Sequence, residues 1–484
     1  MSPKTILSRE GYIINKKKFK KEDIEQIKKE LTVVPFLPCI FGNQKPEEFP
    51  VYKENKKFLS VPKYYGLNKL GKPKLIDENP GETVNLQFKG DLRDYQKEIV
   101  NIAMKDMNEN DGGCISVGCG RGKTVMALHI ACLLKVKTLV IVHKTFLLDQ
   151  WKERALQFTN AEIGIIQQNK IETEDKQIVI GMLQSIAKEK YDSDVFSDFG
   201  LVIFDEAHHA PSKYFSKALP QIACKKSLAL SATPKRSDRL EKILFWFMGP
   251  IIYKEKVKHN KNVIAKIYKY NLHHKKFREA KMRYGKQVNR PRTINRLVDL
   301  KKRNTFILDI LQEIMMEPGR KILVLSDRIT HLENLKELFD KREITTTDFY
   351  IGGMSQKKLK IAENAQVLFA SYGMASEALD IPALNTLVMV TPRREIEQSV
   401  GRIIRKKGKV QPTIIDIVDQ LPSLNRQGLH RRKFYKSRGY QMKLIEVEDN
   451  EIIGEDDITD SNNIQLGTNY DVDDDISESV CFLD

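Results

Sequence analysis

The stretch CISVGCGRGKTVMALHIACLL, residues 114–134, decides the fold. The apolar run CISVG at its start predicts a buried strand, and TVMALHIACLL predicts a helix that begins at Thr124. A glycine-rich loop between a strand and a helix N-terminus lets backbone N–H groups converge on a phosphate. The strict pattern G-x-x-x-x-G-K-[ST] needs glycine where Val117 stands, so a glycine-rich turn with an incidental Gly-Lys-Thr remains the alternative.

Short apolar runs recur around this loop and alternate with helical patterns. Between about residues 90 and 250 they are TLVIV (138–142), QIVIGM (177–182), GLVIF (200–204) and SLALS (227–231), and the alternation resumes between about 320 and 445. Continuous apolar strands separated by helices are typical of a parallel sheet covered on both faces. The sequence therefore predicts an α/β protein with two blocks of similar size.

The bulk composition limits the class of protein. A chain of 484 residues is too long for one core, and 41% hydrophobic residues suffice to bury several. No apolar run approaches the roughly 18 residues of a membrane span, and the N-terminus has no secretory signal. The six cysteines show no C-x-x-C pair, which argues against a zinc site. We expect an intracellular protein with free thiols and no membrane partner.

Charge is distributed unevenly along the chain. The net charge is +17, but 14 of the 64 acidic residues lie in residues 446–484, where there is no Lys or Arg. The rest of the chain holds 50 acidic against 81 basic residues. This excess of basic residues favours a polyanionic partner. The alternative is a cationic surface that only keeps the protein soluble. Residues 446–484 are predicted to form a disordered acidic tail.

Two adjacent carboxylates follow the apolar run GLVIF. In FDEAHH (204–209), Asp205 is expected to coordinate Mg²⁺ through its water shell, and Glu206 to orient and deprotonate the attacking water. Standing alone, this peptide would be a surface turn. After a phosphate-binding loop and a buried strand it predicts nucleotide hydrolysis, with Lys123 on the phosphates and Thr124 on the Mg²⁺.

Two further stretches belong to the same block. Ser231 and Thr233, in SATPKRSDRL (231–240), are small hydroxyls suited to bond the Asp-Glu-Ala-His residues and relay phosphate occupancy. Upstream, LRDYQ (92–96) offers the Gln96 amide, which can pair with the N6/N7 edge of adenine and so select ATP. An ordinary strand exit and an ordinary helix start are the respective alternatives.

The second block carries EQSVGRIIRK (397–406), with the pattern Q-x-x-G-R-x-x-R. Spacings of three and four place Gln398, Arg402 and Arg405 on one helix face. Arginines presented together can act on a γ-phosphate as arginine fingers, an effect typically worth about 10³–10⁵ in rate. The alternative is a pair of arginines on a solvated helix face.

The order of these stretches resembles the superfamily 2 helicases and translocases. The resemblance covers roughly residues 89–440 and includes HKTFLLDQW (143–151), GMLQSIA (181–187), KILVLSDRITHLENL (321–335) and FASYGMASEALDIP (369–382). It implies two tandem RecA-like lobes with parallel sheets, and ATP and Mg²⁺ as cofactors. Within the superfamily the motifs are most similar to XPB-like DNA translocases. The stretch TPRREIEQSVGRIIR (391–405) is most similar to helicases of large DNA viruses, including the poxvirus transcript-release helicases.

The resemblance also implies roles for individual residues. The implied ATP-binding residues are Gln96, Gly118, Cys119, Gly120, Arg121, Gly122, Lys123, Thr124 and Asp380. The implied catalytic residues are Glu206, Gln398, Arg402 and Arg405, and the coupling residues are His208, Ser231 and Thr233. The implied nucleic-acid contacts are Lys144, Gln184, Ser185, Arg328 and Ser371. Met182 stands where the family has a backbone-binding Thr, which puts one of those phosphate contacts in doubt.

Five parts of the chain are predicted. They are an N-terminal accessory domain (1–88), a first lobe (89–253), a basic segment (254–303), a second lobe (304–445) and the acidic tail (446–484). The basic segment holds 18 Lys/Arg against three acids, interleaved with Tyr268, Tyr270, Phe277 and Tyr284. It predicts either a linker between lobes or a grip on DNA, with cations on phosphates and aromatic rings on bases.

Taken with the resemblance, these observations predict an ATP-driven motor that moves along nucleic acid, with duplex DNA favoured over RNA. The resemblance to viral helicases implies a role in viral transcription, with RNA polymerase or other transcription factors as partners. A viral protein of this kind would be found in the virion or in the cytoplasm or nucleus of the host cell. A DExH RNA helicase and a DNA-binding transcription factor with a vestigial ATP site remain the alternatives.

Overall fold

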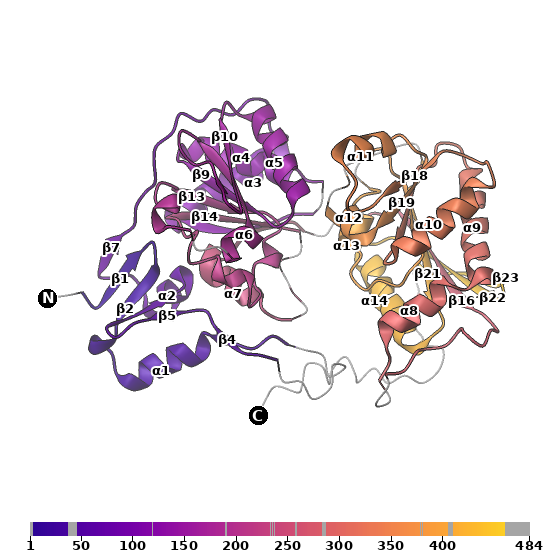
Figure 1. The fold of residues 1–484 in the computed structure, drawn as a ribbon, viewed down its shortest axis with the longest axis horizontal. Coiled ribbons are helices and arrows are strands. Elements are labelled where there is room, and N and C mark those ends of the chain that lie inside the picture. Colours follow the sequence, from indigo (N-terminus) through magenta and orange to yellow (C-terminus); the bar gives the residue numbers. More distant parts are fainter. Residues whose placement is uncertain are drawn as a thin grey trace. The chain divides into compact units, whose positions relative to one another are not determined.

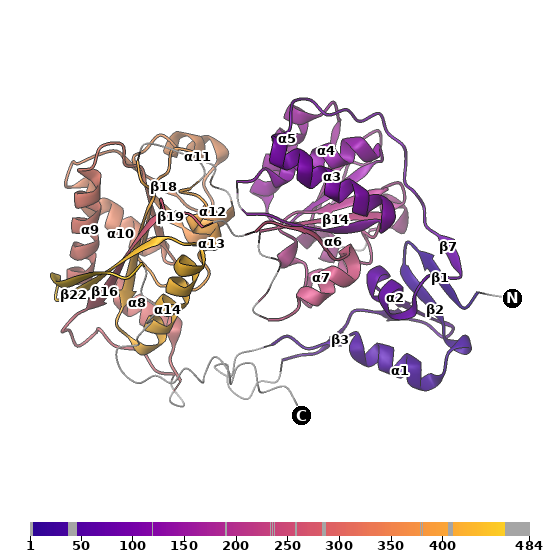
Figure 2. The same ribbon diagram turned by 180° about the vertical axis from the view of Figure 1, so that it is seen from behind.

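The chain forms two compact units, Met1–Glu255 and Lys256–Asp484 (Figure 1, Figure 2). The computed structural model describes residues 3–36, 46–118, 120–188, 191–232, 234, 236, 238–256, 259–282, 287–377, 379, 381–404 and 410–459. Within these ranges, no helix has the length and apolarity needed to span a bilayer.

An eight-stranded sheet is the centre of the first unit, in the order β11-β10-β12-β9-β13-β14-β8-β15. Neighbouring strands run parallel except β10 and β11. Every residue of β8, β9, β12 and β13 is buried, as the continuous apolar runs predicted. The strands are β8 (Gly112–Ser116), β9 (Thr138–Val142), β10 (Ile163–Gln167), β11 (Lys170–Ile171), β12 (Ile178–Met182), β13 (Leu201–Phe204), β14 (Lys226–Ser231) and β15 (Ile251–Lys254).

Helices cover both faces of this sheet (Figure 1). Ile115 and Val140 point to the face where α3 (Asp94–Glu109), α4 (Lys123–Leu134) and α5 (Thr145–Phe158) pack. Cys114 and Leu139 point to the opposite face, where α6 (Leu183–Lys188) and α7 (Glu241–Met248) pack. Residues next to each other in one strand thus enter two separate cores, which is why the strands are apolar throughout.

The N-terminal residues form a second, five-stranded sheet in the same unit. Its order is β5-β6-β2-β1-β7, flanked by α1 (Lys21–Glu30) and α2 (Lys63–Leu70). Its core is continuous with that of the large sheet, since Tyr12 and Ile14 belong to one apolar cluster with Ile243 and Leu244 of α7. The strands are β1 (Thr5–Ser8), β2 (Gly11–Asn15), β5 (Lys53–Glu54), β6 (Phe58–Val61) and β7 (Leu75–Asp77), and a separate pair joins β3 (Thr32–Val33) to β4 (Phe49–Pro50).

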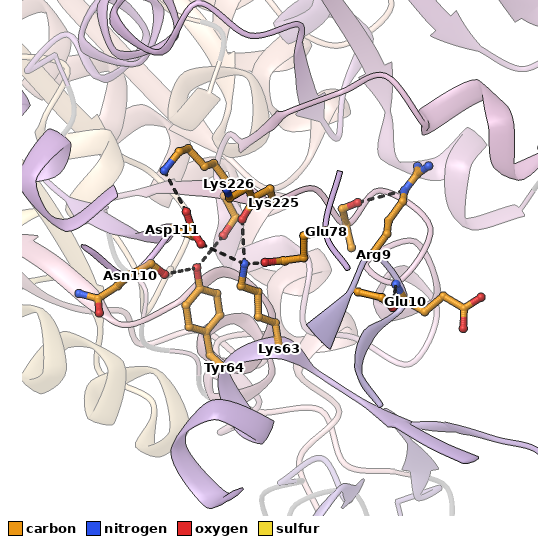
Figure 3. A network of polar contacts seen from close by, with 12 residues as sticks. Arg9, Glu10, Lys63, Tyr64, Glu78, Asn110, Asp111, Lys225 and Lys226 are labelled. Carbon is orange, nitrogen blue, oxygen red and sulfur yellow. Dashed lines mark hydrogen bonds and ion pairs between the residues drawn. The ribbon is translucent and has the colours of Figure 1, made fainter. Parts of the chain in front are cut away.

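A polar network fastens the N-terminal sheet to the large sheet (Figure 3). Lys63, at the start of α2, places its Nζ 2.7 Å from a carboxylate oxygen of Glu78 and 2.9 Å from the carbonyl oxygen of Lys225. The next residue, Tyr64, donates to the carbonyl oxygen of Asn110 over 3.1 Å. Burial raises the pKa of the Glu78 carboxyl, and Lys63 opposes that rise. Ionised Glu78 therefore depends on Lys63.

We expect Lys63→Met to lower the free energy of unfolding by about 3 kcal/mol, because it leaves a buried carboxylate without its cation. Only 11% of the Lys63 side chain and 5% of the Glu78 side chain are exposed. Urea unfolding of the full chain measures the loss. Lys341→Met is the control, because its ion pair with Glu337 is solvent-exposed and its loss should leave the midpoint unchanged. Equal effects of the two substitutions would contradict this account.

The second unit also contains an eight-stranded sheet, in the order β18-β19-β17-β20-β21-β16-β22-β23. Neighbours run parallel except β22 and β23. The strands are β16 (Ile264–Asn271), β17 (Ile322–Ser326), β18 (Thr347–Tyr350), β19 (Val367–Ser371), β20 (Thr386–Met389), β21 (Thr413–Asp419), β22 (Gln441–Glu448) and β23 (Glu451–Asp457). With two such sheets, the predicted α/β fold class is confirmed.

Seven helices accompany this sheet among the described residues. Phe306 of α9 and Leu332 of α10 pack with Val324 on one face, and Leu359 of α11 and Val400 of α13 pack with Leu323 on the other. The helices are α8 (Arg290–Val298), α9 (Lys301–Met315), α10 (Ile329–Asp340), α11 (Gln356–Ala362), α12 (Tyr372–Glu377), α13 (Glu397–Val400) and α14 (Pro422–Ser437).

Most of the described part of the basic segment 254–303 is built into the second unit, and three of its aromatic rings are buried. Its β16 lies inside the second sheet, between β21 and β22. Tyr268 and Tyr270 are 5% and 0% exposed, and Phe277 is also buried, so none of them can stack on a base. The misleading signal is the alternation of β16, in which lysines at the less buried positions are interleaved with buried apolar residues. Tyr284 lies outside the described residues.

The predicted tail boundary at residue 446 is also wrong. Residues 446–448 complete β22, and β23 pairs with it antiparallel at the edge of the sheet. Their carboxylates have lysine partners on neighbouring strands: Glu446 lies 2.9 Å from Lys269, and Glu455 lies 2.7 Å from Lys443. Acidic composition alone therefore misassigned an edge hairpin. The remainder of the predicted tail, 460–484, lies outside the described residues.

Candidate active site

The loop after β8 has the strand–loop–helix form that its sequence predicted. Val117 is 1% exposed and is the last core residue before the loop, which explains why it need not be glycine. Gly120 and Gly122 both have a φ of +76°, a left-handed conformation that glycine adopts without strain. Gly122 is the N-cap of α4, so Lys123 opens the helix. Cys119 lies outside the described residues.

The carboxylates after β13 meet this loop at one edge of the sheet. The carboxyl ends of β8 and β13 are separated only by β14. This topology brings Lys123 Nζ to within 3.8 Å of Glu206 Oε1, and both side chains are nearly buried. Glu206 itself has a φ of +46°, an uncommon conformation for a residue with a side chain, and such strain clusters at functional sites.

Asp205 is held by two N–H donors. Its Oδ2 accepts from the indole Nε1 of Trp151 over 2.7 Å, and its Oδ1 accepts from the backbone N–H of Glu206 over 3.0 Å. Asp205 is 6% exposed. Burial and the adjacent Glu206 raise the pKa of the Asp205 carboxyl to about 6, although the Trp151 hydrogen bond and Lys123 oppose the rise. Such a carboxylate gains from a nearby cation.

His208 joins the carboxylates to the strand that follows. Its Nδ1 lies 3.4 Å from Glu206 Oε2 and 3.1 Å from the hydroxyl oxygen of Ser231, at the end of β14. The predicted coupling residues His208 and Ser231 are thus brought together beside Glu206, and Thr233 lies outside the described residues. Arg236 donates to the backbone carbonyl of His208 and pairs with Asp238. These two contacts tie the residues after β14 to His208.

Gln96 is buried against the loop rather than open to solvent. Its side-chain oxygen accepts from the backbone N–H of Arg93 over 2.9 Å, and its Nε2 donates to the carbonyl oxygen of Arg121 over 3.2 Å. A side chain on Gly122 would collide with this amide, since a Cβ there would lie 2.3 Å from Gln96 Nε2. Gln96 therefore shapes the loop, and only its second N–H and second lone pair remain for an adenine.

The predicted residues of the second unit are placed less favourably. The helix α13 ends at Val400, so Arg402 lies beyond the helix that carries Gln398. Arg402 is 7% exposed and donates to the carbonyl oxygen of Leu379 over 2.7 Å. Arg402 thus has a structural contact inside its own unit, and its role as an arginine finger stays a prediction. Gln398 is half-buried on α13, and Arg405 and Asp380 lie outside the described residues.

The predicted nucleic-acid contacts divide into two groups. Lys144 is the N-cap of α5 and Gln184 lies in α6, where it donates to the carbonyl of His143, so these two lie close together after β9 and β12. Ser185 is 8% exposed and its hydroxyl accepts from the backbone N–H of Gln168, so it has a structural contact, and its nucleic-acid contact stays a prediction. Met182 is buried at the end of β12.

Two predicted contacts belong to the second unit. Arg328 is the N-cap of α10, and its guanidinium donates to the side chain of Asn295 over 2.7 Å and to the carbonyl oxygen of Pro291 over 3.4 Å. It is thus supported by α8 of the basic segment. Ser371 is half-buried at the end of β19, so its hydroxyl sits at the carboxyl edge of that sheet.

Several known proteins are similar to this chain. Residues 89–236 match the family described as "Type III restriction enzyme, res subunit". The chain is 39% identical over 459 residues to a putative ATP-dependent RNA helicase (L396) of Acanthamoeba polyphaga mimivirus, and the match covers 92% of this chain and 88% of that protein. The chain belongs to the superfamily 2 helicases. This helicase is also 27% identical over 424 residues to the DNA 3'-5' translocase XPB2 of Sulfurisphaera tokodaii, covering 78% of this chain and 92% of the translocase.

The fold of the helicase is shared with a solved DNA-bound enzyme. The "ATP-dependent Type ISP restriction-modification enzyme LlaBIII" has a TM-score of 0.54 over 74% of this chain, at 16% identity. This chain spans 32% of that enzyme, and a likeness at this identity concerns the fold alone. It agrees with the two RecA-like lobes predicted from the sequence. Membership of the family makes the protein a nucleic-acid-dependent ATPase.

One residue of this site was missed by sequence reasoning. Glu255 ends the first unit, and its Oε1 lies 2.7 Å from the Arg121 guanidinium. Its Oε2 accepts from the backbone N–H of Gly118 over 3.1 Å. The same guanidinium lies 4.1 Å from the ring centroid of Tyr95. The phosphate-binding loop is therefore clamped between Tyr95 and Glu255. The available signal was an acidic residue at the start of a segment with 18 cations.

We expect Glu255→Ala to raise the KM for ATP by about tenfold and to change kcat less, because charge-assisted hydrogen bonds of this kind contribute about 1.5–3 kcal/mol. Steady-state ATPase assays with saturating nucleic acid measure both constants. Glu255→Gln is the matched control: it retains an acceptor for the Gly118 N–H and loses the ion pair, so its KM should lie in between. An unchanged KM in Glu255→Ala would show that the clamp does not shape the loop.

Proposed function

We propose that this helicase is an ATP-driven motor that moves along duplex DNA and acts in viral transcription. The observation that supports the hydrolytic part best is the convergence of Lys123 and Glu206, with 3.8 Å between Nζ and Oε1, beside the buried Asp205. A cation, a general base and a second carboxylate at the edge of a parallel sheet form the set of groups that phosphoryl transfer to water needs.

Each of these side chains has a proposed task. Lys123 and the loop N–H groups would neutralise and orient the phosphates of ATP. Glu206 would hold the attacking water and accept its proton, and His208 Nδ1 lies 3.4 Å from its Oε2. His208 also contacts Ser231, so a displacement of Ser231 would be passed to the base.

The residues also fit a Mg²⁺ ion. Each oxygen of Asp205 receives one N–H donor and retains a lone pair, and Thr124 places a hydroxyl in the first turn of α4. Hard oxygen donors of this kind are the ligands that Mg²⁺ prefers. When bound, Mg²⁺ would supply positive charge to the β- and γ-phosphates. Asp205 would then be kept ionised despite its burial.

Three observations support DNA as the track. Residues 1–445 carry 81 basic against 50 acidic residues, which suits a phosphate backbone. Lys144 and Gln184 lie together after β9 and β12, where a strand could be held without reading its bases. A relative aligned over 92% of its length is named a DNA 3'-5' translocase. The resemblance of residues 391–405 to helicases of large DNA viruses supports the role in transcription, with RNA polymerase as the partner.

The proposal is tested by ATPase assays with blunt duplex DNA, single-stranded DNA and RNA, each at 50 and 200 mM salt, and by displacement of a third strand from a DNA triplex. We expect duplex DNA to stimulate hydrolysis most, with displacement that requires ATP and strong weakening at the higher salt. Stimulation by DNA without triplex displacement would contradict translocation.

An RNA helicase is the second candidate, because the mimivirus relative carries the name of an ATP-dependent RNA helicase. The same assays separate the two. If RNA alone stimulates hydrolysis, and if an RNA duplex is unwound while the DNA triplex remains intact, the track is RNA and the proposed DNA substrate is wrong.

A further inference from the structure

The indole of Trp151 lies at an unusual place for a buried aromatic side chain. Trp151 is 1% exposed in α5, and its Nε1–H donates to Oδ2 of Asp205 over 2.7 Å. Buried indole N–H groups need an acceptor, and backbone carbonyls usually supply it. Here the acceptor is the carboxylate that is proposed to hold the divalent cation.

The ring itself has little freedom. It belongs to an apolar cluster that contains Leu147, Leu148 and Ala155 of the same helix together with strand residues of the sheet. The indole N–H holds one oxygen of the Asp205 carboxylate, and the backbone N–H of Glu206 holds the other. Together the two donors fix the plane of the carboxylate. Without the indole, Asp205 could rotate about its side-chain bonds, and the lone pairs offered to a cation would point elsewhere.

We infer that Trp151 is a positioning residue for the cation site, which holds the Asp205 carboxylate in the orientation that Mg²⁺ bound with nucleotide requires. The inference rests on the proposed function of Asp205 as the acidic side chain of the Mg²⁺ site. Groups that orient a ligand of a metal typically change metal affinity by roughly 10–100-fold when they are removed. Trp151 lies six residues after Thr145, about 9 Å along α5 from the end where Lys144 stands, so the same helix carries a proposed nucleic-acid contact and this donor.

The test compares ADP binding with and without Mg²⁺ in Trp151→Phe, which keeps an aromatic ring and removes the N–H. In the unsubstituted protein, Mg²⁺ should tighten ADP binding. In Trp151→Phe, we expect the Mg²⁺-dependent gain to fall by about tenfold while the Kd for ADP in EDTA changes less than twofold. The Kd in EDTA reports whether the loop is still folded, so lost positioning is distinguished from lost structure. A full Mg²⁺-dependent gain in Trp151→Phe would overturn the inference.

Two matched variants sharpen the result. Trp246, the other tryptophan of the chain, packs in the opposite core, so Trp246→Phe should keep the whole Mg²⁺-dependent gain. In an Asp205→Asn background the gain should already be lost, and adding Trp151→Phe should reduce it no further, since Trp151 acts through Asp205. A further additive loss in the double variant would contradict this route.

Fluorescence decides the question if Trp151→Phe does not fold. In Trp246→Phe protein, Trp151 is the single tryptophan, and its emission reports the field of the Asp205 carboxylate. We expect Mg²⁺ added to ADP-bound protein to change that emission, and EDTA to reverse the change. Unchanged emission would overturn the inference. If the protein binds no nucleotide under any condition, the proposed function fails instead.

Discussion

Lys123→Ala is expected to reduce ATP hydrolysis at least about a thousandfold, to the background of the assay. Lys123 Nζ is 3.8 Å from the proposed base and 3.5 Å from the carbonyl oxygen of Val117, and its side chain is 10% exposed. A cation held in a partly buried site stabilises developing phosphate charge far more than one in water, and losing it removes several kcal/mol from the transition state. Hydrolysis of labelled ATP with saturating duplex DNA measures the effect.

Lys105→Ala provides the control for Lys123→Ala. Lys105 is exposed on α3, in the same unit but away from the loop, so its removal should leave hydrolysis unchanged. The Lys123→Ala protein should retain the unfolding midpoint of the unsubstituted protein within a few degrees, because alanine is a good helix former at the first position of α4. Turnover above about 1% of the unsubstituted rate in Lys123→Ala would refute the assignment of this loop as the phosphate site.

Glu206→Gln should separate ATP binding from ATP hydrolysis. The amide keeps the size of the side chain and its contact with His208, but it has no basicity with which to accept a proton from water. We expect hydrolysis to fall about 10²–10⁴-fold, the usual contribution of a general base, while the Kd for ATP changes little. Single-turnover hydrolysis and equilibrium binding of ATP measure the two quantities separately.

The control for Glu206→Gln is Glu153→Gln, a solvent-exposed position on α5. It should hydrolyse ATP at the unsubstituted rate. If Glu206→Gln kept full activity in transcript release, ATP hydrolysis would not be required for that activity. The alternative of a DNA-binding transcription factor with a vestigial ATP site would then explain the protein better than a motor does.

Most buried strands of the two eight-stranded sheets, and the phosphate-binding loop, could be predicted from the sequence because their signals are local. A parallel strand buried on both faces is apolar at nearly every position. TLVIV (138–142) has this pattern, and every one of its residues is buried. The loop is likewise specified by consecutive residues. Gly120 and Gly122 in it adopt the positive φ that glycine permits. Even the meeting of Lys123 and Glu206 follows from one rule, that carboxyl ends of parallel strands share an edge.

The misjudged parts depend on partners distant in sequence. Composition could not show that Tyr270 lies in a core, because its burial comes from the neighbours of β16, namely β21 and β22. The acidic β23 is ordered by pairing with β22 and not by its own residues. Arg402 matches a motif for arginine fingers, but its guanidinium also donates to the carbonyl of Leu379, 23 residues away. Residue type alone did not predict this contact inside the second unit.

The continuity of the N-terminal core with the large sheet decides how the protein can be cut. A fragment that began at residue 89, where the family match starts, would remove Tyr12 and Ile14 and open the cluster they form with α7 to water. A fragment that stopped at residue 445 would shorten β22 and remove β23, which leaves the outer edge of β22 unpaired. The smallest piece suited to expression and crystallisation therefore spans Thr5 to Asp457 and not the helicase motifs alone.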